Sequence, residues 1–129
     1  MELKFESEWE LKALNRVLFE AKYNNSPNDY DVQGSPFSKS LCDKVFALII
    51  DKSNETEVIS WNQWRQLESH IERLDNLKSR LSNIHSSNWF PLSTEDRIKY
   101  IHNLVSPLVA GENLVQELVN FANNVHKGN

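Results

Sequence analysis

Apolar residues recur at helical spacing along most of the chain. In residues 8–23 they fall three or four positions apart, and charged residues occupy the opposite face. Ser7 and Glu10 form a Ser-x-x-Glu capping box ahead of this pattern, which predicts that a helix begins there. A run of turn-forming residues, Asn24–Asp29, ends the pattern. Residues 24–35 are therefore predicted to form a loop.

A second helix is predicted to begin at Pro36, with Ser35 as its N-cap, because proline at the first helical position loses no hydrogen bond. The apolar run 45–50 taken alone also fits a buried strand, but the upstream cap and the spacing favour a helix. The polar residues 51–57 are predicted to form a turn. The apolar stripe of this helix consists of Phe37, Leu41, Val45, Leu48 and Ile49.

The longest apolar pattern begins at Ser60 and ends at His85. Ser60 and Gln63 form a second capping box, and apolar residues recur at helical spacing to the end of the segment. The pattern predicts one helix of some 25 residues, roughly 37 Å long, as the central spine of the molecule. Lys78 and Arg80 lie near its end, where positive charge complements the helix dipole.

Two more helices are predicted in the remaining part of the chain. Ser93 and Asp96 supply an N-cap for a helix through about Leu104, which Ser106–Pro107 must break or kink because proline has no amide hydrogen to donate. Residues 112–125 carry the last apolar pattern. Together these segments predict an all-α fold, a four- to five-helix antiparallel bundle in a single domain spanning residues 1–129.

Composition and charge narrow the classes of partner. The chain has 129 residues, of which 40% are hydrophobic and 25% charged, as in a protein that folds by itself. Its formal net charge is −4, whereas nucleic-acid binding needs a clustered excess of basic residues. The acidic excess lies in residues 1–57, which favours a basic partner.

The N-terminus and the cysteine content indicate a cytoplasmic protein. The first residues alternate charged with apolar side chains, which predicts neither a signal peptide nor a membrane span. Cys42 is the one cysteine, so no intramolecular disulfide is expected, and its apolar neighbours predict an unreactive thiol in the core.

No residue pattern predicts catalysis, a metal site or a cofactor. The histidines lack the spacing of metal ligands and are predicted to lie at the solvated surface, and three glycines are too few for a phosphate-binding loop. Sites assembled from residues far apart in sequence leave no such signal. The four histidines are His70, His85, His102 and His126.

Two stretches outside the regular pattern combine aromatic with polar or acidic residues, a composition typical of contact surfaces. Tyrosine and tryptophan offer large contact area with few rotatable bonds, and flanking acids suit a basic partner. In the alternative interpretation, Trp89 and Phe90 plug the end of the bundle and Tyr30 pins its loop. The predicted partner-binding residues are Asp29, Tyr30, Asp31, Trp89 and Phe90.

Three function classes follow, in decreasing order of support. The first is a non-catalytic protein-binding module, in the manner of a small acidic inhibitor, immunity factor or adaptor. The second is an enzyme or small-molecule receptor with a pocket between helices. The third is a DNA-associated regulator whose helix pair binds a groove. Residues 61–66 could separately be interpreted as a nucleic-acid reader in which Trp61 and Trp64 stack on bases, although core packing explains these two residues better. The apolar seam of residues 60–85 also allows pairing between subunits.

Overall fold

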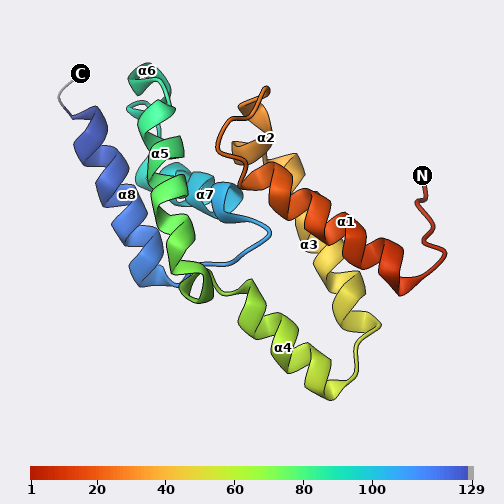
Figure 1. Cartoon of the computed structure of the whole chain (residues 1–129). Helices are drawn as coiled ribbons and strands as arrows, with labels where there is room; N and C mark the ends of the chain where they lie inside the picture. Colours follow the sequence, from red (N-terminus) through yellow and green to blue (C-terminus); the bar gives the residue numbers. More distant parts are fainter. Residues whose placement is uncertain (128–129) are drawn as a thin grey trace.

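The computed structural model describes residues 1–127 and confirms the predicted all-α fold (Figure 1). The first part of the described chain forms α1 (Glu8–Lys22), α2 (Asp31–Gly34), α3 (Pro36–Asp51) and α4 (Glu55–Arg65). The second part forms the 3₁₀ helix η1 (Leu67–Arg73), α5 (Leu74–Asn83), α6 (Ser86–Trp89), α7 (Thr94–Val105) and α8 (Glu112–His126).

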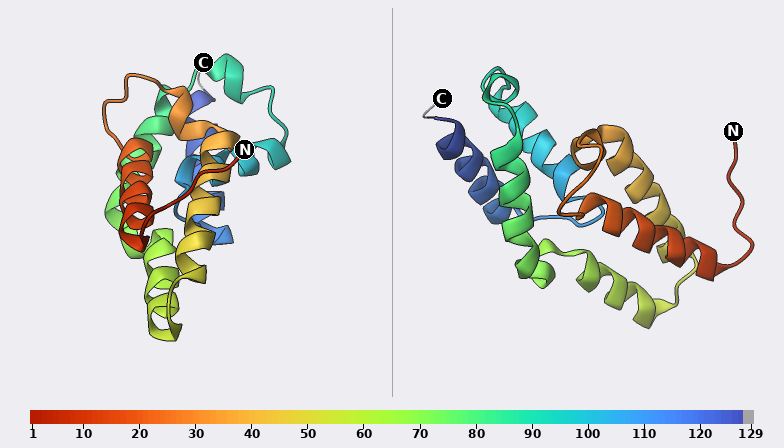
Figure 2. Two further views of the ribbon diagram at one scale, coloured as in Figure 1. Left: turned by 90° about the vertical axis from the view of Figure 1, so that its right-hand side faces the viewer. Right: turned by 45° about the horizontal axis from the view of Figure 1, so that its top comes forward.

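The longer helices fall into two groups that meet at α7. Helix α1 packs along α3 at one end of the molecule, and α5 and α7 pack on α8 at the other (Figures 1 and 2). Helix α7 also contacts α2 and α3, so it joins the two groups. Helix α4 runs across the base between them (Figure 1).

Three of the predicted helix starts are confirmed by side-chain caps, whereas the predicted cap at Ser60 is wrong because Ser60 lies inside α4. The Ser7 hydroxyl accepts a hydrogen bond from the Glu10 amide at 3.4 Å, and the Ser93 hydroxyl accepts one from the Asp96 amide at 3.1 Å. Ser35 caps α3. Each cap satisfies an amide that has no partner within the helix.

The prediction of one continuous helix over residues 60–85 is wrong. Helix α4 begins earlier, behind a capping box of Asn54 and Glu57, and ends at Arg65. Residue 66 is extended, and residues 65–67 pair with Val109: the Leu67 amide donates to the Val109 carbonyl, and the Val109 amide donates to the Arg65 carbonyl, both at 2.8 Å. This pairing replaces helical hydrogen bonds and buries Leu67 completely. A tertiary contact thus overrides the helical pattern.

The core consists of two clusters. The smaller lies between α1, α3 and α4, and its fully buried members are Leu11, Val45 and Ile49. Trp61 packs against this cluster and Trp64 against the larger one, as core packing predicts for both. The larger cluster contains buried residues of η1, α5, α6, α7 and α8, including Leu67, Leu77, Leu81, Trp89, Ile101, Leu104, Leu118 and Ala122.

A buried lysine joins the two helix groups and positions α2. The Lys22 ammonium, at the end of α1, donates to the carbonyls of Gln33 and Asn103, both at 2.5 Å, and to the Ser106 hydroxyl at 3.0 Å. The Gln33 side chain donates to the Ala21 carbonyl at 3.0 Å. These bonds hold the end of α2 against α1 and α7.

Candidate functional site

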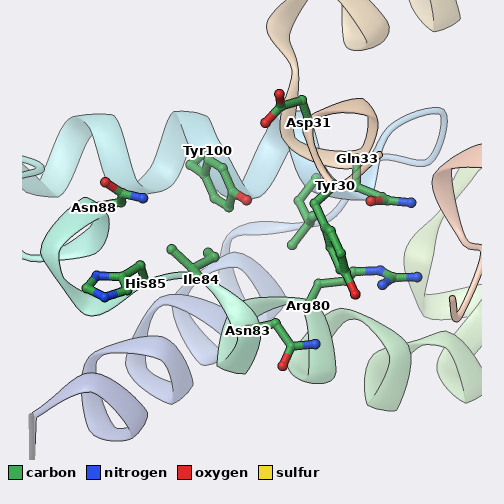
Figure 3. A pocket seen from close by; sticks show the side chains of 10 residues that line it. Tyr30, Asp31, Gln33, Arg80, Asn83, Ile84, His85, Asn88 and Tyr100 are labelled. Atoms are coloured by element: carbon green, nitrogen blue, oxygen red, sulfur yellow. The ribbon is translucent and has the colours of Figure 1, made fainter. Parts of the chain in front are cut away.

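A pocket of about 480 Å³ lies between α2, α5, α7 and the segment that precedes α6. Tyr30 and Gln33 enter it from α2 and its N-cap, Arg80 and Asn83 from α5, and Tyr100 from α7 (Figure 3). Its apolar lining comes from Ile84 and Leu104. Its polar lining consists of Tyr30, Asp31, Gln33, Arg80, Asn83, His85, Asn88 and Tyr100.

Of the predicted contact residues of the first stretch, Tyr30 and Asp31 line this pocket and Asp29 does not. Asp29 and Asp31 are exposed, and the Asp29 carboxylate accepts a hydrogen bond from the Asp31 amide at 2.9 Å, which fixes the start of α2. The Tyr30 side chain is 63% exposed and extends toward Arg80 and Asn83 (Figure 3). Tyr30 thus presents an aromatic ring to solvent above a polar pocket.

The two aromatic residues of the second stretch have opposite positions. Trp89 is 0% exposed, its indole N–H donates to the Asn123 side chain at 2.9 Å, and it belongs to the larger core cluster. This burial corresponds to the plug interpretation, and Trp89 offers no contact surface. Phe90 is 47% exposed and lines a second pocket of about 610 Å³.

The pockets that the two stretches line share one short segment of the chain. Residues 83–85 line both pockets, with Tyr30 at the first pocket and Phe90 at the second. The two exposed aromatic side chains therefore flank one short segment, although they are far apart in sequence. Spacing along the chain holds no signal for this juxtaposition, because it depends on the docking of α2 on α7.

The wall of the first pocket that faces α2 is formed by Tyr100. Its ring packs directly on Gly34, where a side chain would collide with it. Burial raises the pKa of the Tyr100 hydroxyl, and the nearby Asp31 carboxylate raises it further. Tyr100 therefore stays a neutral hydrogen-bonding group.

Arg80 is the functional candidate that the sequence pattern missed. Its position near the end of a predicted helix suggested only a favourable interaction with the helix dipole. In the structure Arg80 is 7% exposed and lines the pocket, and burial lowers the pKa of its guanidinium, an effect that nearby Tyr30 opposes.

The Cys42 thiol lies in the core, as predicted, and burial raises its pKa. The ammonium group of Lys22 lies close enough to oppose this effect, and burial in turn lowers the pKa of Lys22 to about 8. The lysine protons all have acceptors on the backbone and on Ser106. Lys22 and Cys42 therefore have a structural role.

The prediction of a solvated surface position is wrong for His126, which is 1% exposed. Its Nε2 lies 2.9 Å from the Leu81 carbonyl, which fixes the proton on that nitrogen, and its Nδ1 lies 2.8 Å from the Ser86 hydroxyl. These bonds connect α8 to α5 and α6. Helix α8 continues one residue beyond the predicted end at Val125, and His126 lies on its buried face.

Within residues 1–127, no three histidine, cysteine, aspartate or glutamate side chains are grouped so as to hold a metal ion. The helices described in that range are also too short or too polar to cross a membrane. Comparison of the chain with family models, curated proteins and solved structures gives no match. The geometry of the pocket region is therefore the basis for a functional proposal.

Proposed function

We propose that the chain is a non-catalytic protein-binding module of the kind represented by small inhibitors, immunity factors and adaptors. Its contact face consists of residues 29–31, 83–88 and 90. The observation that carries the proposal is the exposure of Tyr30 and Phe90 on either side of residues 83–85. Partner residues that cover both rings would remove a large apolar area from water.

The charge and the rigidity of the contact face support the same function. Asp29 and Asp31 are exposed at its rim, where they would accelerate encounter with a basic surface and fix its orientation. Two hydrogen bonds fix the end of α2: Lys22 donates to the Gln33 carbonyl, and the Gln33 side chain donates to the Ala21 carbonyl. A face that is already ordered loses little conformational entropy on binding, which favours affinity.

Site-specific photo-crosslinking in the native host tests the proposal. A photoreactive phenylalanine analogue replaces Tyr30, Phe90 or Trp9 in separate variants. Trp9 is the matched control, because it is an aromatic residue that is 67% exposed on α1, outside the contact face. Crosslinked proteins are identified by mass spectrometry.

The proposal expects the same protein to be crosslinked from positions 30 and 90 and not from position 9. Replacement of Asp29 and Asp31 by asparagine should weaken this crosslinking, and added salt should weaken it in the wild-type background. Crosslinking that is equal at the three positions, or confined to position 9, would contradict the contact face.

A further inference from the structure

Helix α3 exposes a line of apolar side chains to solvent. Phe37 is 83% exposed, and Leu41 and Leu48 are each 43% exposed. Their spacing places all three on one face of the helix. Contiguous exposed apolar side chains are typical of a surface that another molecule covers. The buried residues of α3 lie on a different face and are Cys42, Val45, Phe46 and Ile49.

The apolar line continues through two charged residues at the spacing of a coiled-coil seam. Steps of four and three residues alternate along α3 and keep the side chains on the side of a helix that faces a second helix. Lys44 and Asp51 are exposed, and neither has an ion-pair partner among residues 1–127. The α3 seam consists of Phe37, Leu41, Lys44, Leu48 and Asp51.

The two charges of the α3 seam indicate what covers it. They have opposite signs and lie about two helical turns apart. In an antiparallel pair of α3 helices that cross close to residue 46, Lys44 of each copy lies about one turn from Asp51 of the other. Leu48 of each copy then packs on the aliphatic part of the other copy's Lys44.

A parallel pair of α3 helices lacks this complementarity. In register, it would bring the two Lys44 side chains together and the two Asp51 side chains together, and like charges in contact oppose association. The seam is therefore complementary to a second copy of itself in the antiparallel direction.

We infer that the chain forms a homodimer in which α3 of one copy packs antiparallel on α3 of the other. Leu41 and Leu48 lose their exposed surface to the second copy. Two Lys44–Asp51 pairs, related by symmetry, fix the register, because polar residues within an apolar seam specify alignment. The same surface is used on both copies, so assembly stops at two.

The inference goes beyond the proposed function, because the contact face contains no residue of α3. A dimer formed through α3 would carry two contact faces. Residues 60–85, the other segment considered for pairing between subunits, form no continuous seam, because α4 ends at Arg65. Purified chain without any partner suffices for the test, so failure of the dimer and failure of the contact face are distinguishable.

Sedimentation velocity of the purified chain over a wide range of concentrations tests the inference. We expect a reversible equilibrium between monomer and dimer. Leu41→Ser combined with Leu48→Ser should raise the dissociation constant of the dimer at least about tenfold, because the apolar area of the seam is lost. Ile59→Ser is the control and should leave it unchanged, because Ile59 is 57% exposed on α4, outside the seam.

Charge reversal tests the antiparallel register. Lys44→Glu should raise the dissociation constant at least about tenfold, because it places two acidic groups together across the interface. Lys44→Glu combined with Asp51→Lys should restore it to within about threefold of the wild type, because the opposite charges meet again. Lys4→Glu changes the net charge equally outside α3 and should have no effect.

Restoration by the double reversal also shows that charge changes on α3 leave the fold intact. A chain that stays monomeric at all concentrations overturns the inference. A dimer that resists both the serine and the charge variants, or that responds equally to Ile59→Ser, overturns it as well, because its interface then lies outside the α3 seam. Failure of the double reversal to restore association overturns the antiparallel register.

Discussion

The ring of Tyr100 lies directly on the backbone of Gly34. A Cβ atom at residue 34 would lie 2.7 Å from Cε2 of that ring and 2.8 Å from its hydroxyl oxygen. These distances are shorter than van der Waals contact, so only glycine lets α2 approach α7 this closely. This contact sets the width of the first pocket, because Tyr100 forms its wall.

Gly34→Ala should destabilise the protein by about 1–3 kcal/mol, because the added methyl group forces Tyr100 to move. Denaturant unfolding measures the change. Gly111→Ala is the control without a ring contact: its Cβ would meet only the flexible end of Glu68, at 3.2 Å, so we expect only the loss of about 0.5–1 kcal/mol that follows from alanine at the N-cap of α8. Equal effects of the two substitutions would contradict the Tyr100 contact.

Arg80→Met should raise the free energy of unfolding by about 1–3 kcal/mol, because it removes a buried charge that lacks a partner. Arg73→Met should instead lower it by about 0.5–2 kcal/mol, because the Arg73 guanidinium lies over the rings of Phe19 and Tyr23. Both changes are measured by denaturant unfolding without ligand. A loss of stability in Arg80→Met would show that this guanidinium has a structural partner.

Leu67→Ala should lower stability by about 2–5 kcal/mol, because Leu67 is completely buried. Ile71→Ala should change it by no more than about 0.5 kcal/mol, because Ile71 is 60% exposed. Four residues separate them, so an unbroken helix would place both on one face. Comparable losses in the two variants would favour that helix over the break at residue 66.

The stability contribution of Lys22 should increase with pH between about 8 and 10.5. Burial lowers its pKa from 10.5 to about 8. Within this window the unfolded chain holds a proton that the folded chain has released, so the free energy of unfolding rises with pH. Below the window both states are protonated, and this dependence vanishes.

The measurement compares the protein with Lys22→Met at several pH values, with Cys42→Ala in both backgrounds so that the neighbouring thiol does not titrate. The difference in unfolding free energy should grow in favour of Lys22 by up to about 3 kcal/mol across the window. A difference that is constant with pH would show that the Lys22 pKa is not lowered.

Local patterns predicted those parts of the fold that depend on neighbouring residues. Ser7, Ser35 and Ser93 act as helix caps as their positions predict, and α7 ends immediately before Ser106–Pro107. Caps and proline stops act through hydrogen bonds within a few residues, so sequence spacing contains the necessary information.

The break at residue 66 depends on Val109, more than 40 residues away, and no local pattern contains that contact. The candidate site was missed for the same reason, because it also depends on contacts between residues far apart in sequence. Exposure of Tyr30 and Phe90 is consistent with the predicted contact stretches, but the burial of Trp89 and the pocket around Arg80 arise from packing between distant helices. Arg80 therefore looked like an ordinary surface charge.

The proposed contact face is tested most directly by the affinity of the partner found by crosslinking. Isothermal titration calorimetry compares the wild-type chain, Tyr30→Ala and the exposed-aromatic control Trp9→Ala. We predict that Tyr30→Ala weakens binding by about 2 kcal/mol or more, as for an aromatic anchor, and that Trp9→Ala binds like the wild type. Unchanged affinity in Tyr30→Ala, or a larger loss in Trp9→Ala, would contradict the assignment of the contact face.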